Sequence, residues 1–215
     1  MAVVITVAQQ KGGAGKTTLA ANLAAALAAT RKVALLDIDP QHSLARWNAL
    51  RLARPAPATP IACVDVSGWR VATELERMRR EYDVVLVDSP PQVDQDARRA
   101  IRGADLVLIP VQPSAPDLWA AEGTVKLTAE EKRPVGLVLN RVPPGAKARA
   151  DADAALHTAG HTVLPAVLGN RAAFAQSFAQ GLGVTEHAPR STAAAEVWAL
   201  LAAVEAIVGL GEKRP

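Results

Sequence analysis

The 215-residue sequence contains one cysteine and few aromatic residues, and both shortages narrow the functions open to it. A single cysteine, Cys63, excludes a disulfide framework and a cysteine-based metal site within one chain. It stands in the apolar run IACVDV, so we interpret it as a core residue. Aromatic residues make up only 3% of the chain, which argues against a surface that stacks the bases of single-stranded nucleic acid.

The sequence also lacks a long apolar run and a strong charge of either sign. No apolar stretch reaches the roughly 18 residues that a membrane span requires. The opening MAVVITVAQQ has the pattern of a strand entering a loop, without the charged and then apolar layout of a signal peptide. We therefore expect a cytoplasmic protein. The net charge of +3 and the pI of about 9.3 permit contact with DNA or acidic lipid but do not require it.

What the chain does contain is an alternation of apolar, strand-length runs with helical patterns from one end to the other. Runs such as Val84–Asp88 (VVLVD) and Leu106–Val111 (LVLIPV) are almost continuously apolar, as in strands that are covered on both faces. This alternation predicts an α/β fold in which helices cover both faces of a mostly parallel, twisted sheet. At this length we expect a single domain over residues 1–215.

The expected elements follow from these patterns. We expect strands at Val3–Ala8, Lys32–Asp37, Ile61–Val66, Val84–Asp88, Leu106–Val111 and Val135–Asn140. We expect helices at Thr17–Ala29, Ser43–Ala53, Val71–Arg80, Gln95–Arg102, Leu118–Glu130, Ala146–Thr158 and Ser191–Val208. The proline-rich Arg54–Pro60 (RPAPATP) is predicted to be a loop.

A glycine-rich segment, Lys11–Thr18 (KGGAGKTT), directly follows the first expected strand. Its glycines let successive backbone N–H groups point inward at phosphate oxygens, and the helix that follows adds its positive end. Lys16 would place a charge at the β- and γ-phosphates, and the Thr17 hydroxyl is placed to bind Mg²⁺. The segment therefore predicts a nucleotide-phosphate site. Its expected members are Gly12, Gly13, Ala14, Gly15, Lys16, Thr17 and Thr18.

The ordinary phosphate-loop pattern, G-x-x-x-x-G-K-[ST], fails at its first position, which is Gln10. With Lys11 beside it, the segment resembles the deviant Walker A loop of the ParA/MinD ATPases, K-G-G-x-G-K-[ST]. The resemblance implies a three-layer P-loop NTPase fold, ATP and Mg²⁺ as ligands, and a homodimer that forms when ATP is bound. It also implies that Lys11 crosses the dimer interface to the phosphates held by the partner subunit.

Two acidic segments at expected strand ends also resemble the family. The run DIDPQHS, which begins at Asp37, is similar to its first switch. By resemblance Asp39 orients the attacking water, with Asp37 in the outer shell of the metal, while His42 stands where the family varies freely. The run VVLVDSPP resembles a Walker B strand, and Asp88 would hold Mg²⁺ through a water. The resemblance thus assigns the metal to Thr17, Asp39 and Asp88, and catalysis to Lys11, Lys16 and Asp39. A helix-capping aspartate at a strand end is the alternative for Asp39.

Later segments extend the resemblance. Asn140 ends an expected strand where the family has an asparagine, and an amide can pair with the edge of adenine, so we expect Asn140 and Arg141 to contact the nucleotide. A turn-forming asparagine is the alternative. The segment PVQPSAPD also resembles the family, and we expect it, including Asp117, to support the switches and the subunit interface.

The segment Asn170–Ser191 carries the family's order of arginine, apolar helix, glycine and Pro-x-Ser. Arg171 matches a position that contacts DNA in several ParA proteins, and such a contact would be to phosphates and insensitive to sequence. Arg190 and Lys213 are weaker candidates for DNA binding. An exposed arginine at a helix start is the alternative for Arg171.

Together these features predict a small ParA-type ATPase, without an N-terminal helix-turn-helix domain, that uses the nucleoid to position a cargo. ATP would join two subunits, the dimer would bind nonspecific DNA, and a ParB-like or cargo-adaptor partner would stimulate hydrolysis. We expect a nucleoid-associated protein without stable membrane association, because Ala199–Leu210 has little basic character. Two alternatives remain open: a membrane-recruited regulator of MinD or flagellar-number type, and an amidoligase or biotin-pathway-type synthase.

Overall fold

The computed structural model of the chain describes residues 1–55, 58–92, 95–158 and 160–211. Lys213, one of the two weaker DNA-binding candidates, lies outside these residues. Within them, no helix is both long enough and apolar enough to cross a membrane.

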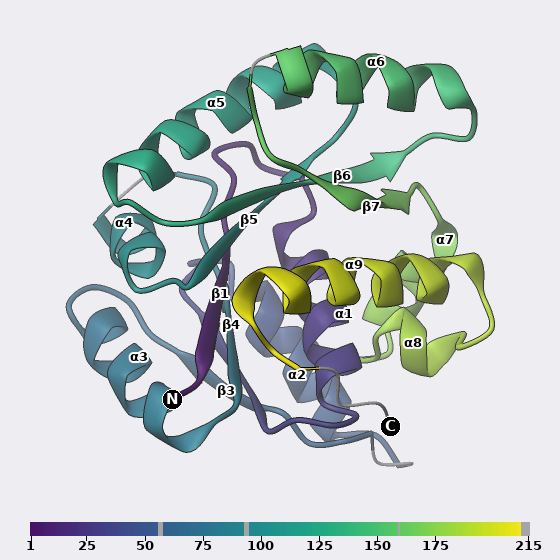
Figure 1. Cartoon of the computed structure of the whole chain (residues 1–215). Coiled ribbons are helices and arrows are strands. Elements are labelled where there is room, and N and C mark those ends of the chain that lie inside the picture. Colours follow the sequence, from purple (N-terminus) through teal and green to yellow (C-terminus); the bar gives the residue numbers. More distant parts are fainter. Residues whose placement is uncertain (56–57, 93–94, 159, 212–215) are drawn as a thin grey trace.

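The described chain forms a seven-stranded sheet in the order β3-β2-β4-β1-β5-β6-β7 (Figure 1). Every pair of neighbouring strands is parallel. The strands are β1 (Val3–Val7), β2 (Val33–Asp37), β3 (Ala62–Asp65), β4 (Val84–Asp88), β5 (Leu106–Val111), β6 (Val135–Val142) and β7 (Val163–Gly169). The predicted fold class is therefore confirmed.

Nine helices lie in the described part of the chain. They are α1 (Lys16–Leu27), α2 (Ser43–Leu52), α3 (Arg70–Glu81), α4 (Gln95–Arg102), α5 (Ala115–Glu130), α6 (Ala146–Thr158), α7 (Ala172–Phe178), α8 (Val184–His187) and α9 (Thr192–Val208). Figure 1 shows α3 to α6 along one side of the sheet and α1, α2, α8 and α9 along the other.

The apolar strands are buried on both faces because alternate side chains enter different cores. Leu35 and Leu86 belong to the core beneath α1, α2, α8 and α9. The next residues along the same strands, Leu36 and Val87, belong to the core beneath α3 and α4. Cys63 packs half-buried against the first core, and burial raises the pKa of its thiol to about 12. The thiol is thus an unreactive part of the core, as its apolar surroundings in the sequence predicted.

The sheet register brings acidic residues together at the carboxyl ends of the central strands. Val7, Asp37 and Asp88 are paired at the carboxyl ends of β1, β2 and β4. The chain leaves β1 at its carboxyl end, passes through the glycine-rich loop and enters α1 at Lys16. Because α1 is rich in alanine, it lies buried along most of its surface between the sheet and the outer helices. The positive end of α1 is therefore fixed beside the acidic strand ends.

A buried arginine links α2 to α8 and to the segment that precedes α8. The Arg51 guanidinium pairs with Glu186 (2.5 and 2.8 Å), donates to the carbonyl oxygens of Thr59 and Gly181, and stacks over Trp47. The Arg51 side chain is fully buried, whereas Glu186 keeps 24% of its side chain exposed. The ion pair is thus part of the packing of α2.

We expect Arg51→Met to lower the free energy of unfolding by about 2–3 kcal/mol, since it leaves a half-buried carboxylate and the carbonyls of Thr59 and buried Gly181 without their donor. Urea denaturation measures the change. The matched control is Arg54→Met, because the half-buried Arg54 side chain donates to the Gln180 carbonyl in a hydrogen bond that is exposed to solvent, and the substitution should cost less than about 1 kcal/mol. Equal losses in both variants would contradict the structural role of Arg51.

Candidate nucleotide site

The glycine-rich loop has the backbone of an anion cradle. Gly13 and Gly15 have φ of 77° and 94°, a region that favours glycine. A Cβ atom at Gly15 would come within 2.4 Å of the Asn140 amide nitrogen. Among the described residues, the backbone N–H groups from Gly12 to Gly15 have no hydrogen-bond partner. A loop with four free N–H groups at the start of a helix suits a bound phosphate chain.

Lys16 lies across this loop. Its ammonium donates to the carbonyl oxygens of Gln9 (3.1 Å) and Lys11 (3.4 Å), and the residue is only 6% exposed. Burial lowers the pKa of Lys16, while the charges of Asp88 and Asp39 act in the opposite direction. Since both protein acceptors are neutral carbonyls, phosphate oxygens can replace them with a gain in electrostatic energy.

Most of the residues predicted for the phosphates and the metal line one cleft of about 220 Å³, while Asp88 is buried outside its lining. Its walls are Gly12, Gly13, Gly15, Lys16, Thr17, Thr18, Asp39, Gln41, Ser43, Pro91 and Arg141. Ala14 is fully buried behind the loop, and Lys11 lies outside this lining. Most residues predicted for the site are therefore brought together at the carboxyl ends of the strands.

Asp88 has the surroundings that fit a metal-binding carboxylate best. The residue is fully buried, and neither carboxylate oxygen has a hydrogen-bond partner among the described residues. Burial raises the pKa of Asp88 to about 8, and the nearby Thr17 hydroxyl offsets only part of this effect without reaching normal hydrogen-bond geometry. An unsatisfied buried carboxylate beside a threonine hydroxyl is a donor set that fits Mg²⁺.

The other two acids of the first switch have different surroundings. Asp37 accepts hydrogen bonds from the backbone N–H groups of Asp39 (3.1 Å) and Ala45 (2.9 Å), so it holds the turn and the start of α2. Asp39 accepts from the N–H of Gln41 (2.9 Å) through one oxygen and lines the cleft. His42 follows in the left-handed region and pairs with Asp65 at 2.8 Å. The structure thus gives Asp37 and His42 places in the scaffold and leaves Asp39 facing the cleft.

Lys11 is held within its own subunit. Its ammonium pairs with Asp117 in the first turn of α5, and the Ser114 hydroxyl donates to the same carboxylate at 2.6 Å. Asp117 is 1% exposed, whereas the Lys11 side chain keeps 38% of its surface exposed. The neighbouring Gln10 lies against Gly123 of α5, where an added Cβ would be 2.6 Å from its amide. Gln10, which departs from the ordinary phosphate-loop pattern, and Lys11, which marks the deviant one, therefore both contact α5.

Asn140 is used by the loop itself. Its amide nitrogen donates to the Ala14 carbonyl at 2.7 Å, and its amide oxygen accepts from the Arg141 N–H at 2.9 Å. The side chains of Arg141 and Gln112 donate to the carbonyl of Gly13. These bonds engage the carbonyl oxygens of Gly13 and Ala14, whereas the N–H groups of the loop have no partner among the described residues. The role of Asn140 as a reader of adenine stays a prediction.

A second cavity, of about 170 Å³, adjoins the phosphate cleft and shares Thr18 and Arg141 with it. It lies between α1 and α7, with Leu19 and Phe174 among its apolar walls. Asn170 and Arg171, which follow β7, line it as well. An apolar cavity beside a phosphate cradle suits a nucleobase. Asn170 and Phe174 were not predicted for the nucleotide site.

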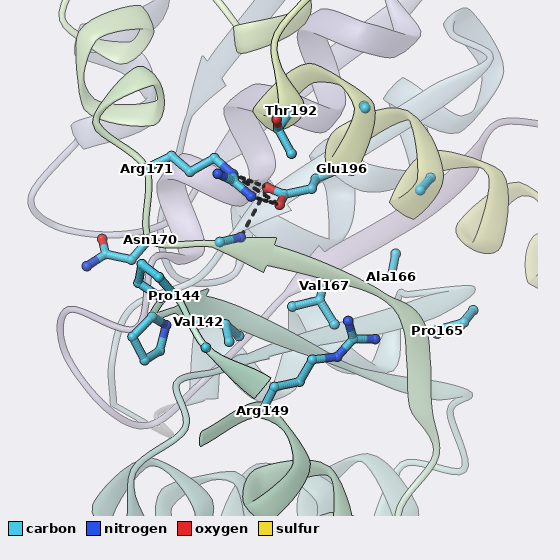
Figure 2. Close-up of a pocket in the computed structure, with 15 residues that line it drawn as sticks. Val142, Pro144, Arg149, Pro165, Ala166, Val167, Asn170, Arg171, Thr192 and Glu196 are labelled. Atoms are coloured by element: carbon cyan, nitrogen blue, oxygen red, sulfur yellow. Dashed lines mark hydrogen bonds and ion pairs between the residues drawn. The ribbon is translucent and has the colours of Figure 1, made fainter. Parts of the chain in front are cut away.

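The two arginines proposed for DNA lie away from the phosphate cleft. Arg171 follows β7 and forms an ion pair with Glu196 of α9 at 2.6 Å (Figure 2). Arg190 is exposed just before α9. Both arginine side chains are therefore accessible to solvent, although the Arg171 guanidinium is already paired with Glu196.

Comparison with known families shows to which family a chain with this site belongs. The family model described as "CobQ/CobB/MinD/ParA nucleotide binding domain" matches residues 5–184. The chain belongs to this family. The match covers the glycine-rich loop, Asp39, Asp88 and the strands that lead to these two acids. The chain is an ATPase of the ParA/MinD type.

Individual members of the family are similar over different lengths. "Maintenance of carboxysome distribution protein A" of Halothiobacillus neapolitanus is 30% identical over 201 residues, which is 91% of this chain and 92% of the relative. "Chromosome partitioning protein ParA" of Myxococcus xanthus is 32% identical over 162 residues, or 58% of this chain and 56% of the relative.

Solved structures of family members have the same fold. An apo structure of McdA from Cyanothece has a TM-score of 0.82 at 18% identity, over 95% of this chain and all of that chain. MinD of Pyrococcus horikoshii, solved with Mg-ADP, has a TM-score of 0.80 at 19% identity over the whole of both chains. At these identities the likeness confirms the three-layer P-loop fold.

Proposed function

We propose that this ParA/MinD-family ATPase forms a homodimer with ATP, binds DNA without sequence preference and positions a cargo over the nucleoid. The observation that carries the proposal is the placement of Lys11. Its side chain is partly exposed and its ammonium pairs with a carboxylate of the same subunit, while Lys16 already spans the loop. The ATPase thus has one lysine for its own nucleotide and a second that is available to another subunit.

Within one subunit, the described residues provide each part of the hydrolysis site. The free N–H groups of the loop and Lys16 would bind the β- and γ-phosphates. Thr17 and Asp88 would hold Mg²⁺, which neutralises charge on the phosphate oxygens. Asp39 has one oxygen engaged by Gln41 and would use the other to orient the attacking water.

Dimer formation would exchange one partner of Lys11 for another. On moving to the phosphates of the partner subunit, Lys11 leaves Asp117, whose carboxylate is 1% exposed and then keeps the Ser114 hydroxyl as donor. Leaving a buried carboxylate costs several kcal/mol, and the triphosphate must offset this cost. The exchange therefore favours the dimer when ATP is bound and the monomer once the γ-phosphate has left.

The cargo and the DNA surface are proposed by analogy with relatives. The relative that matches this chain over 92% of its own length is named for carboxysome distribution, and another is named for chromosome partitioning. Both names describe positioning, which supports a cytoplasmic, nucleoid-associated protein that works with a cargo-bound or ParB-like partner. Arg171 and Arg190 are the proposed contacts to DNA phosphates, and the net charge of +3 is compatible with them.

A membrane-recruited regulator of the MinD type is the second candidate. A MinD protein of Thermotoga maritima is 27% identical over 180 residues, and solved MinD structures have the same fold. Against this candidate, α9 (TAAAEVWALLAAVEAIV) contains no lysine or arginine and packs its apolar face into the core. Binding of the ATP form to anionic vesicles, without binding to duplex DNA, would favour the MinD-type function.

We expect Asp39→Ala to lower ATP turnover by about 100-fold or more and to accumulate an ATP-bound dimer, because the water loses its orienting carboxylate while the phosphate contacts remain. Light scattering with ATP and Mg²⁺ should give twice the chain mass of 22.5 kDa. The control is the Asp39→Ala, Lys11→Ala double variant, which should bind ATP and stay monomeric. A monomeric Asp39→Ala protein saturated with ATP would contradict the proposal.

A further inference from the structure

The Arg171 side chain lies on the wall of a groove that is separate from the phosphate cleft. The groove has a volume of about 530 Å³ and runs along the free edge of β7, between α9 and the start of α6 (Figure 2). Its lining combines small and apolar side chains with two arginines, Arg149 and Arg171, and one acid, Glu196. Among the described residues, Arg149 forms no ion pair. The charged groups of the groove are thus cationic apart from Glu196.

Glu196 occupies the position of an external anion. Its two oxygens accept from the Arg171 guanidinium at 2.6, 3.0 and 3.0 Å, and one of them also accepts from the backbone N–H of Gly169 at 3.1 Å. An arginine fork together with a backbone N–H is the donor set that proteins use for phosphate oxygens. The carboxylate therefore fills a ready-made anion site at the end of β7.

The backbone fixes this site. Gly169 has no side chain, and an added Cβ would lie 3.0 Å from the Arg171 guanidinium, so the guanidinium rests directly on the strand end. Glu196 comes from the second turn of α9, where Thr192 and Ala195 are also small enough to leave the groove open. Figure 2 shows Arg149 on the other side of β7 from the pair.

We propose that Glu196 holds Arg171 in an intramolecular pair that a DNA phosphate must displace, so that Glu196 sets the DNA affinity of the ATPase. This inference rests on the proposed DNA-binding function. The pair is exposed enough to exchange, since 40% of the Arg171 side chain and 17% of Glu196 remain accessible. Displacement frees Glu196 to solvent and leaves Arg149 and Arg171 for the DNA backbone.

The same residues offer a route from nucleotide to DNA. Gly169, Asn170 and Arg171 line both the groove and the cavity beside the phosphate cleft. A nucleobase in that cavity would contact the segment that carries Arg171 and would bias the position of the guanidinium. The pair with Glu196 is thus the element that nucleotide and DNA would both act on.

The test compares wild type, Glu196→Gln, Arg171→Ala and the double variant in fluorescence anisotropy with a duplex of arbitrary sequence, ATP and Mg²⁺, over a salt series. Glu196→Gln keeps the shape of the side chain and should tighten binding about fivefold, with the slope of log affinity on log salt little changed, because Arg171 contacts the same phosphate in both proteins. In the Arg171→Ala background the gain should vanish. Glu196→Ala is measured alongside, since glutamine can still accept a hydrogen bond.

The control is Glu205→Gln, which removes the same charge from the same helix at its pair with Arg31, outside the groove. A gain no larger than that of Glu205→Gln, or one that persists without Arg171, overturns the inference. If Arg171→Ala weakens DNA binding and the Glu196 variants do not tighten it, the proposed function stands and this inference fails. If no protein binds duplex while all bind ATP, the proposed function fails together with it.

Discussion

Lys16→Ala should lower the affinity for ATP by at least about 100-fold. In the free protein the ammonium spans the loop through two carbonyl contacts, and the nucleotide exchanges these for charge-assisted contacts to two phosphates, each worth about 1.5–3 kcal/mol. Alanine loses both contacts and leaves the buried Asp88 without its nearby positive charge. Isothermal titration calorimetry with ATP and Mg²⁺ measures the loss.

The control for this variant is Lys126→Ala, which removes an exposed lysine from α5 without touching the loop. Its ATP affinity should equal that of wild type. Thermal unfolding should show that Lys16→Ala remains folded. Micromolar binding by a folded Lys16→Ala protein would mean that the loop does not bind the phosphates in the manner described.

The free protein should also lose stability as the pH rises towards 8, and Asp88→Asn should remove most of that loss. Burial raises the pKa of Asp88 to about 8 in the folded chain, compared with about 3.9 for an exposed aspartate. Between these values the folded state holds a proton that the unfolded state has released, so the free energy of unfolding falls with increasing pH. Asp37, whose pKa is also raised by burial, adds to the trend.

The expected difference between wild type and Asp88→Asn is roughly 2–3 kcal/mol between pH 5.5 and pH 8, from a limit of about 1.4 kcal/mol per pH unit. Urea denaturation of the protein without nucleotide or metal measures it at both pH values. Mg²⁺ with ATP should restore stability at pH 8, because the metal uses the ionised carboxylate. Parallel pH dependence in the two proteins would show that Asp88 titrates normally.

Much of the fold could be predicted because the sheet is buried on both sides. A strand such as Val84–Asp88 is continuously apolar and ends at an acid, so its bounds were predicted correctly. The start of α5 was predicted three residues late, at Leu118, whereas the helix begins at Ala115 and holds Pro116 in its first turn, where proline is favourable. β7 was missed, since Pro165 interrupts its apolar pattern, and only an edge strand tolerates a proline there.

The residues of the candidate site could be predicted where they lie in one short segment of the sequence. The glycines of the loop and the acids at the strand ends are of this kind. Contacts between distant segments did not: Lys11 and Asp117 are 106 residues apart, and Asn140 and Ala14 are 126 residues apart. Asp117 was expected only to support the switches and the interface, because nothing local shows which cation reaches a buried carboxylate. For the same reason the second cavity, which adjoins the phosphate cleft, was not predicted: its walls come from α1, β6, β7 and α7.

The two edges of the sheet limit how subunits of this ATPase can assemble. At one edge β3 has four residues, and at the other β7 contains the exposed Pro165, which has no N–H to offer. Short edge strands and edge prolines prevent one sheet from continuing into the next. Growth into a fibre by strand pairing is therefore blocked at both ends. Contacts between copies of this ATPase must therefore use helices and loops, and neither edge of the sheet offers a long strand from which a polymer could start.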